Sequence, residues 1–261
     1  MIASLSALYR HWDFMVAMSR RELKVVHKGW LLGAGWLVIG PLVRVGAYVM
    51  LVSVVFRQHV AGMEGALGYA LYVLSGLIPW QIMIRTLEES PDMIRQRLDM
   101  LKQTPYPVEI LPALHLSPTL LAAGAATAIF FLLALVSGKF GPHILLFPIP
   151  LALLISFCIG TAWLLSIVGL VLRDLREVLS IVLGLLIYVS PVVLSENMLG
   201  ETLWMVVLAN PLSHAVITFR DTLLGQWHPL SWIVFAVLST SSLLAGAWAI
   251  AKVKIHINDL G

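Results

Sequence analysis

Six apolar runs, each close to the length that crosses a bilayer, constrain this chain more than any other feature of its sequence. A membrane-spanning helix needs about 20 mostly apolar residues, because lipid offers no hydrogen-bond partner to an open backbone. The runs cover residues 30–56, 67–84, 110–136, 144–172, 178–194 and 230–251. They predict an all-α integral membrane protein with six transmembrane helices per protomer.

Composition supports a membrane protein. The chain is 59% hydrophobic, against about 45–50% in soluble domains, and a soluble core of this size could not bury so much apolar surface. The single cysteine, Cys158, lies in an apolar run, so we expect no disulfide, no metal site and no cofactor in this chain. The net charge of +3 is too small to indicate a nucleic-acid partner.

The distribution of basic residues predicts the orientation. If the N-terminus is cytoplasmic, thirteen of the seventeen basic residues fall on the cytoplasmic side, and only Arg57, Lys139 and Arg220 fall outside. Cytoplasmic loops of membrane proteins carry such an excess of Lys and Arg. We therefore expect both termini, including the tail at residues 252–261, in the cytoplasm. On this topology Arg220 and Asp221 would be external and exposed.

Two further segments are predicted to be helical without spanning the bilayer. Residues 1–29 carry apolar side chains at intervals of three and four, with basic residues on the other faces, which is typical of an amphipathic helix at the cytoplasmic interface. Residues 195–229 contain an apolar run that is too short to cross. We expect two short re-entrant helices there, on the outer side between spans five and six.

Residues 85–107 gather charge of both signs between two apolar spans. Ser90, Pro91 and Asp92 together are typical of a helix start, with Ser90 as the N-cap. Ile94, Leu98 and Leu101 would then form one apolar stripe of a short cytoplasmic helix. The alternative is a solvated connector, although a plain connector could be much shorter.

Several blocks of the chain resemble, in order, the ABC-2-type permeases that export O-antigen, capsule or teichoic-acid polymers. The N-terminal block is "SRRELKVVHKGWLLGAGWLVIGPLVRVGAYVMLVSVVF", in which Lys28-Gly29, Leu32-Gly33, Trp36, Pro41 and Tyr48 match. Further blocks are "LSGLIPW", "PYPVEILP", "VLRDLREVL", "SPVVLS" and "NPLSHAVITFRDTLLG". Each match is weak alone, but the ordered set is specific and covers nearly the whole chain.

The resemblance implies the transmembrane subunit of an exporter in the bacterial inner membrane. The sequence has no G-x-x-x-x-G-K-[ST] phosphate loop, so ATP and Mg would bind a separate ATPase subunit. Two permeases, as a homodimer, and two ATPases would form the exporter of a lipid-linked polysaccharide. The charged segment would be the coupling helix seated in the ATPase, and the capsule-export branch would also need periplasmic export proteins. The coupling residues would be Glu88, Glu89, Asp92, Arg95, Arg97 and Asp99.

Candidate conduit residues are aromatic or basic side chains within or beside the spans. They are Trp36, Arg44, Tyr48, Trp80, Trp163 and Tyr188. An aromatic face can stack on sugar rings, and a central arginine, which costs about 2.5–3.5 kcal/mol to insert, usually faces a bundle interior or a water path. Ordinary packing, the interfacial aromatic belt and snorkelling of the arginine remain open alternatives.

Two turns are further candidates. Ser190 and Pro191 would break the fifth span near its outer end and, with Asn210 and Pro211, form an external gate; a benign kink is equally compatible. Arg173, Asp174, Arg176 and Glu177 form a mixed-charge cytoplasmic turn that is either a local ion-paired loop or a means of holding adjacent spans together.

Other functions fit the sequence less well. An intramembrane enzyme would need clustered acids or a His/Asp constellation at the span ends, and we expect no catalytic residue. A secondary transporter would need buried acids and inverted repeats, which the spans lack. A drug- or lipid-exporting ABC-2-type permease is the nearest alternative, since only the quoted blocks separate it from a polymer exporter.

Overall fold

The computed structural model describes residues 65–97, 108–138, 141–192, 194 and 196–259, together with scattered positions among the first 50. All regular structure in these ranges is helical, as predicted. The α-helices are α4 (Gly65–Glu89), α6 (Leu111–Val136), α7 (Pro148–Val171), α8 (Leu175–Leu186), α9 (Glu196–Ala209), α10 (Pro211–Leu224) and α11 (Pro229–Asp259). Short 3₁₀ helices cover Ser90–Asp92, Arg95–Arg97, Val108–Ile110, Pro142–Leu146 and Ile187–Val189.

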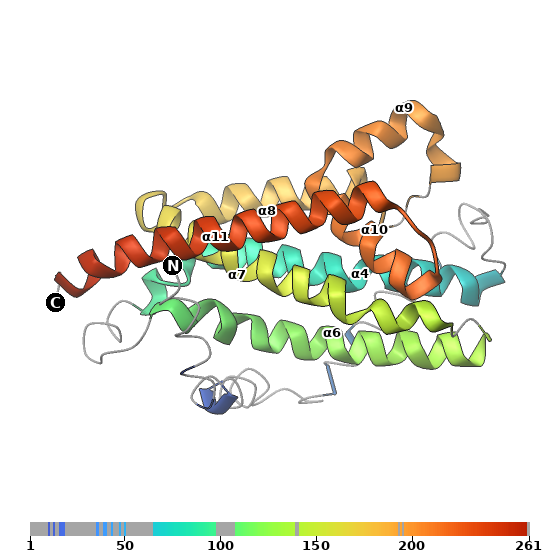
Figure 1. Cartoon of the computed structure of the whole chain (residues 1–261), viewed down its shortest axis with the longest axis horizontal. Coiled ribbons are helices and arrows are strands. Elements are labelled where there is room, and N and C mark those ends of the chain that lie inside the picture. The colour runs from blue at the N-terminus through green and yellow to red at the C-terminus, as the bar shows by residue number, and fades with distance from the viewer. Residues whose placement is uncertain are drawn as a thin grey trace.

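The helices α4, α6, α7, α8 and α11 lie lengthwise beside one another (Figure 1). Residues 90–97, the turn between α7 and α8 and the C-terminal end of α11 lie at one end of this bundle. We call this end the inner end. The opposite or outer end carries α9 and α10. The predicted cytoplasmic segments that the structure describes therefore meet at one end of the molecule.

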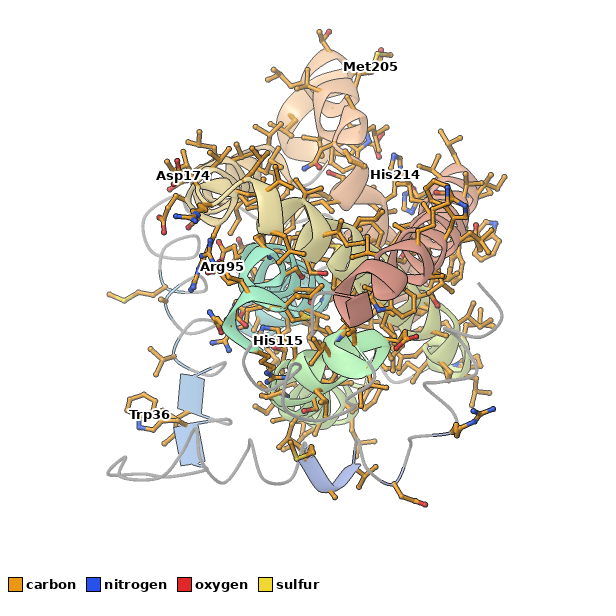
Figure 2. The ribbon with its side chains drawn as sticks, turned by 90° about the vertical axis from the view of Figure 1, so that its left-hand side faces the viewer. Trp36, Arg95, His115, Asp174, Met205 and His214 are labelled. Atoms are coloured by element: carbon orange, nitrogen blue, oxygen red, sulfur yellow. The ribbon has the colours of Figure 1, made fainter. Side chains whose placement is uncertain are left out.

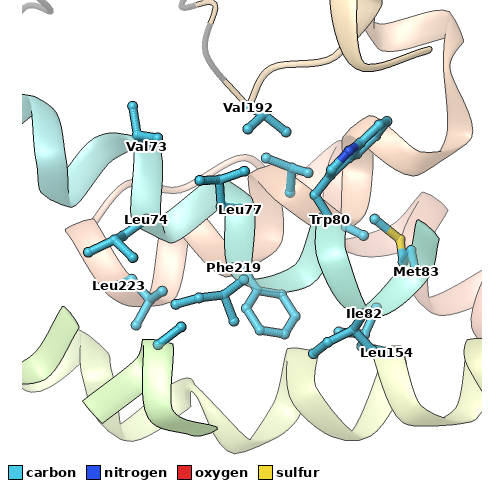
Figure 3. Packing of buried hydrophobic residues seen from close by; sticks show 14 of the residues in the cluster. Val73, Leu74, Leu77, Trp80, Ile82, Met83, Leu154, Val192, Phe219 and Leu223 are labelled. Atoms are coloured by element: carbon cyan, nitrogen blue, oxygen red, sulfur yellow. The ribbon is translucent and has the colours of Figure 1, made fainter. Parts of the chain in front are cut away.

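Helix α4 is the central element of the bundle. In the span Leu67–Asp92, 78% of the most apolar window is buried, against 22–33% in the other three long spans. Leu74, Leu77 and Met83 of α4 are buried together with Leu154 of α7 and Phe219 of α10 (Figure 3). Helices α6, α7, α8 and α11 expose apolar side chains outward, as expected of helices that face lipid.

Four of the six predicted spans are present as helices long and apolar enough to cross a membrane: Leu67–Asp92, Val108–Val136, Pro142–Val171 and Pro229–Val253. The predicted first span, residues 30–56, and the predicted interface helix, residues 1–29, lie almost wholly outside the described residues. The predicted fifth span, residues 178–194, is instead the 12-residue α8 followed by a 3₁₀ helix that ends at Val189. It is shorter than predicted because the chain turns at Ser190 and Pro191.

Two short helices follow, as predicted for residues 195–229. Helices α9 and α10 are bent by 110° relative to each other, as in a broken span or a re-entrant loop. Asn210 caps α10 by accepting a hydrogen bond from the backbone N–H of Leu212, and Pro211 occupies the first turn. Gly225, in the left-handed conformation at φ 75°, ends the helix. Most of α10 is buried, whereas α9 projects from the bundle.

Helices α7 and α11 cross in very close contact. A Cβ on Gly160 would lie 2.3 Å from the backbone of Ser242, and a Cβ on Gly246 would lie 2.3 Å from the carbonyl oxygen of Gly160. No larger side chain fits at this crossing without moving a backbone. Small residues at such points let membrane helices pack tightly.

Candidate functional site

Residues 90–97, the described part of the charged segment after α4, pack against the bundle. The prediction that Ser90 is the N-cap of a new helix is wrong. The chain leaves α4 directly into a 3₁₀ turn, and the buried Ser90 Oγ donates a hydrogen bond to the carbonyl of Thr86 in the preceding turn. A serine hydroxyl readily bonds a carbonyl four residues earlier, so Ser90 continues α4 rather than starting an independent helix.

Asp92 joins this segment to α8. Its Oδ1 accepts a hydrogen bond from Arg95 in the same segment, and its Oδ2 accepts one from Nη1 of Arg176 at 3.1 Å. Arg176 lies in the first turn of α8. The side chain of Asp92 is only 10% exposed, and a carboxylate with so little water is stabilised by charged donors on both oxygens.

The last turn of α4 supplies two more carboxylates. Glu89 pairs with the ring of His115 on α6. Arg176 lies near enough to Glu88 and Glu89 to attract both. The acidic end of α4 is thus tied to α6 by one contact and to α8 by another. Figure 2, which faces this end of the molecule, labels His115 and Asp174.

The segment also packs tightly onto α7. A Cβ on Gly169 of α7 would lie 2.1 Å from the carbonyl oxygen of Pro91, so only glycine admits the turn at this point. Met93 and Ile94 are buried in a small apolar cluster with Trp163 of α7. Pro91, Asp92, Met93 and Ile94 are all buried, so this part of the segment does not protrude into the cytoplasm as expected. Leu98 and Leu101, the other members of the predicted stripe, lie outside the described residues.

The remaining inner-end residues are more exposed. Arg95 and Arg97 are half-buried, and Asp99 lies outside the described residues. Arg173, Asp174 and Glu177 are all exposed. Within the described ranges these three make no ion pair, so the local ion pairing expected of this turn is absent there. The turn is instead tied to α4 through Arg176.

At the outer end, the expectation that Arg220 and Asp221 are exposed is wrong. Arg220 is 4% exposed and Asp221 is 3% exposed. Helix α10 turns back into the bundle instead of lying on its surface, so both charges enter the protein. Each is then surrounded by hydrogen-bond partners, as a buried charge requires.

Arg220 binds α4 and the turn that follows α8. Its guanidinium lies over the ring of Tyr72, 3.6 Å from the centroid, and Nη1 donates to the Tyr72 hydroxyl at 2.8 Å. Nη2 donates to the carbonyl oxygens of Pro191 at 2.7 Å and Val192 at 3.3 Å. The Tyr72 hydroxyl donates in turn to the carbonyl of Leu194 at 2.9 Å. This arrangement, the Arg220 clamp, holds Pro191, Val192 and Leu194 against α4.

Asp221 fixes the connection between α10 and α11. Its carboxylate accepts hydrogen bonds from the backbone N–H of His228 at 2.8 Å, from the His228 ring and from Nε1 of Trp232 at 2.9 Å. The hydrogen bond to Asp221 raises the pKa of His228, an effect that exceeds the opposing effect of partial burial. A protonated His228 therefore forms an ion pair with Asp221.

The predicted gate residues lie close together. Nδ2 of Asn210 donates to the carbonyl of Val189 at 3.4 Å. Val189 ends the 3₁₀ helix that follows α8, directly before Ser190 and Pro191. Ser190 is fully buried, and Pro211 is exposed at the start of α10. The structure thus joins the two gate segments, but the gating role stays a prediction.

The predicted conduit residues occupy different environments. Trp80 and Trp163 are buried among packed helices, and Nε1 of Trp163 donates to the carbonyl of Glu109 at 3.1 Å. Tyr188 is 76% exposed and Trp36 is 41% exposed. Arg44 and Tyr48 lie outside the described residues. A common conduit for these side chains stays a prediction.

Sequence reasoning missed the Arg220 clamp and the Asp92–Arg176 contact. Tyr72 and Arg220 are 148 positions apart, and Asp92 and Arg176 are 84 apart, so no helical periodicity relates either pair. The sequence offered one signal, which was the charged pair Arg220 and Asp221 within the short apolar segment that forms α10. His115 is hydrogen-bonded to Glu89, and His214 is hydrogen-bonded to Ser231. Across the described ranges, no group of three His, Cys, Asp or Glu side chains is placed to hold a metal ion.

Comparison with known proteins gives consistent matches over most of the chain. Residues 13–224 match the family model described as "ABC-2 type transporter". A protein of Myxococcus xanthus named "O-antigen export system permease protein RfbA" is 25% identical over 193 residues, which cover 74% of this chain and 72% of that protein. Two Klebsiella pneumoniae proteins with the same name are 24% and 23% identical over 212 residues, 80% of each chain.

Proposed function

This chain belongs to the ABC-2 type transporter family, and from that premise we propose that it is the permease subunit of an ATP-driven exporter of a lipid-linked polysaccharide. The observation that carries the proposal is the match to three O-antigen export permeases along about three quarters or more of this chain. The apolar helices make the chain a multi-pass membrane protein. We place it in the bacterial inner membrane with both termini in the cytoplasm.

The energy would come from a separate subunit. The chain has no phosphate-binding loop, so ATP and Mg would bind an ABC ATPase, present in two copies. The ATPase would contact the inner end, where charged groups of both signs surround residues 88–97. Mixed charge beside buried apolar anchors suits a protein partner, because charges set the register of an interface while burial holds it.

The second permease would pack against α8. This helix exposes Val178, Ile181, Val182, Leu185 and Tyr188 along one stripe, with spacings of three and four that place them on one face. Gly184 is exposed on the same helix, and a Cβ on it would meet nothing within 4 Å. A small residue beside such a stripe lets a second helix approach closely. We therefore infer a homodimer whose two α8 helices approach each other.

Polymer movement would then occur between the two permeases. Tyr188 belongs both to the conduit candidates and to the exposed stripe of α8, and a tyrosine ring can stack on sugars. Trp80 and Trp163, which are buried, would meet the polymer in conformations that open the bundle. Trp36, Arg44 and Tyr48 are the remaining conduit candidates. Ser190, Pro191, Asn210 and Pro211 would form the outer gate. Periplasmic export proteins would dock at the outer end if the polymer is a capsule.

Reversal of Arg95 and Arg97 to Glu tests this function at the inner end. The double variant should still insert in the membrane but lose most of its polymer export, because the ATPase would meet the wrong charges. The measurements are the amount of permease in membranes, co-purification of the ATPase and surface polymer. Reversal of Glu196 and Glu201 to Lys, two exposed acids at the outer end, is the matched control. Normal export by the Arg95/Arg97 variant would contradict a coupling role for this segment.

A further inference from the structure

We propose that Asp92 is a positioning residue that passes movement of residues 90–97 to α8 through its ion pair with Arg176. The inference rests on the proposed function, because it describes how an ATPase at the inner end would move the permease. It goes beyond that function by naming the contact that transmits the movement and the helix that receives it.

The first step is that residues 90–94 move with the bundle and cannot swing freely. Pro91 sits against Gly169 of α7 with no room for even a methyl group. Met93 and Ile94 are buried beside Trp163. Close-packed interiors transmit displacement because they have few voids to absorb it. A push on this segment is therefore delivered to whatever it is attached to.

The second step is that Asp92 attaches the segment to α8. One carboxylate oxygen of Asp92 is bound by Arg95, on the more exposed part of the segment, and the other by Arg176 on α8. The Asp92 side chain is shielded from water, whereas Arg176 is 46% exposed at the start of a helix with an exposed apolar face. The buried carboxylate thus lies between the surface that a partner can reach and the helix that would face the second permease.

The third step is that α8 connects the two ends of the molecule. It runs from Arg176 toward the outer end (Figure 1). The 3₁₀ helix Ile187–Val189 follows it directly and leads into the turn at Ser190 and Pro191. The Arg220 clamp holds that turn by the carbonyl oxygens of Pro191 and Val192. A displacement of Arg176 along or across the helix axis would move this turn and strain its hydrogen bonds to Arg220. The predicted gate therefore lies at the far end of the element that Asp92 holds.

The test is a double-mutant cycle in the reconstituted permease–ATPase complex. Asp92→Asn keeps the shape of the side chain and removes its charge, and Arg176→Met keeps the length of the stem and removes the donors. Each single variant should lower the polymer exported per ATP hydrolysed by about 5-fold to about 150-fold, the usual range of coupling between sites. The double variant should be no worse than the poorer single variant, since residues that act through one contact are not additive.

Controls separate transmission from folding. Asp92→Glu should recover most of the export per ATP, and Glu201→Gln, which removes the charge of an exposed acid at the opposite end of the molecule, should stay within about twofold of wild type. In a chain carrying Asp92→Cys and Arg176→Cys, a short bismaleimide cross-link should raise export per ATP above that of the uncross-linked variant. The native Cys158 is buried and should not react. A stabilising contact without a transmission role would alter unfolding but not this ratio.

Two outcomes would overturn the inference. One is wild-type coupling in Arg176→Met, and the other is a double variant whose loss equals the product of the two single losses. Failure of the proposed function is seen separately, in the wild-type chain. If the wild-type permease binds no ATPase and moves no polymer, both the function and the inference fall. If it does both and the Asp92 variants remain coupled, only the inference falls.

Discussion

A buried arginine destabilises a protein unless acceptors replace the water it loses. Arg220 obtains them from the Tyr72 hydroxyl and from backbone carbonyls, with the Tyr72 ring beneath the guanidinium. Among the described residues, no carboxylate lies within salt-bridge distance of it. The planar guanidinium of arginine can donate to several acceptors in different directions at once. The single ammonium group of a lysine would not reproduce this arrangement.

Loss of the Arg220 side chain should therefore weaken the outer end. Arg220→Met leaves the carbonyls of Pro191 and Val192 without their donor, and each buried unsatisfied group costs about 1–3 kcal/mol. Tyr72→Phe keeps the ring but removes the acceptor of Arg220 Nη1 and the donor to Leu194, so it should also destabilise, by about 1–3 kcal/mol. Thermal unfolding of the purified protein in detergent measures both. An equal midpoint for wild type and Arg220→Met would show that the clamp contributes no stability.

Stability at the outer end should also depend on pH through His228. Its pKa is raised by the hydrogen bond to Asp221, so the protonated form is favoured by folding. The stabilisation is complete below the unfolded pKa, about 6.5, and is lost as pH rises through the higher folded value.

The unfolding midpoint of the wild type should consequently fall more steeply between about pH 6 and about pH 8 than that of His228→Gln. Measurement of both proteins across this range isolates the contribution of one residue. Parallel curves for the two proteins would mean that the His228–Asp221 pair adds nothing to folding.

At the scale of elements, glycine contacts decide how closely the helices approach. Gly160 and Gly246 let α7 and α11 cross with backbones in contact. Gly246→Ala should lower the unfolding midpoint, because overpacking at a rigid contact costs about 1–3 kcal/mol. Gly124→Ala is the matched control, since a Cβ on Gly124 of α6 would meet nothing within 4 Å. If both variants unfold together, the α7–α11 crossing has room that the structure does not show.

Elements were predictable where one local property decides them. Apolar length predicted α4, α6, α7 and α11. The cap of α10 by Asn210 and Pro211 was not predicted, although it follows the ordinary pattern of a helix start. The turn at Ser90 was mispredicted because a serine before a proline can either cap a new helix or bond back to the old one, and only packing against Gly169 selects between them. Contacts such as Asp92 with Arg176 depend on helix packing, which local pattern does not encode.

At the scale of the whole molecule, the two ends differ in chemistry. Within the described ranges, Arg85, Arg95, Arg97, Arg173, Arg176 and Lys252 belong to elements that meet at the inner end. The outer end has Arg220 buried within it. An excess of basic residues marks the cytoplasmic face of a membrane protein, so the side that the inner end faces stays a prediction from charge. The charge pattern did not predict the burial of Arg220.

The central claim is that this permease moves polymer only with the energy of a separate ATPase. The most direct measurement is uptake of a lipid-linked polysaccharide into inverted membrane vesicles that contain the permease, the ATPase or both. We predict uptake only with both subunits and hydrolysable ATP, with none from the permease alone under a proton or sodium gradient. Uptake by the permease alone, driven by such a gradient, would contradict the account.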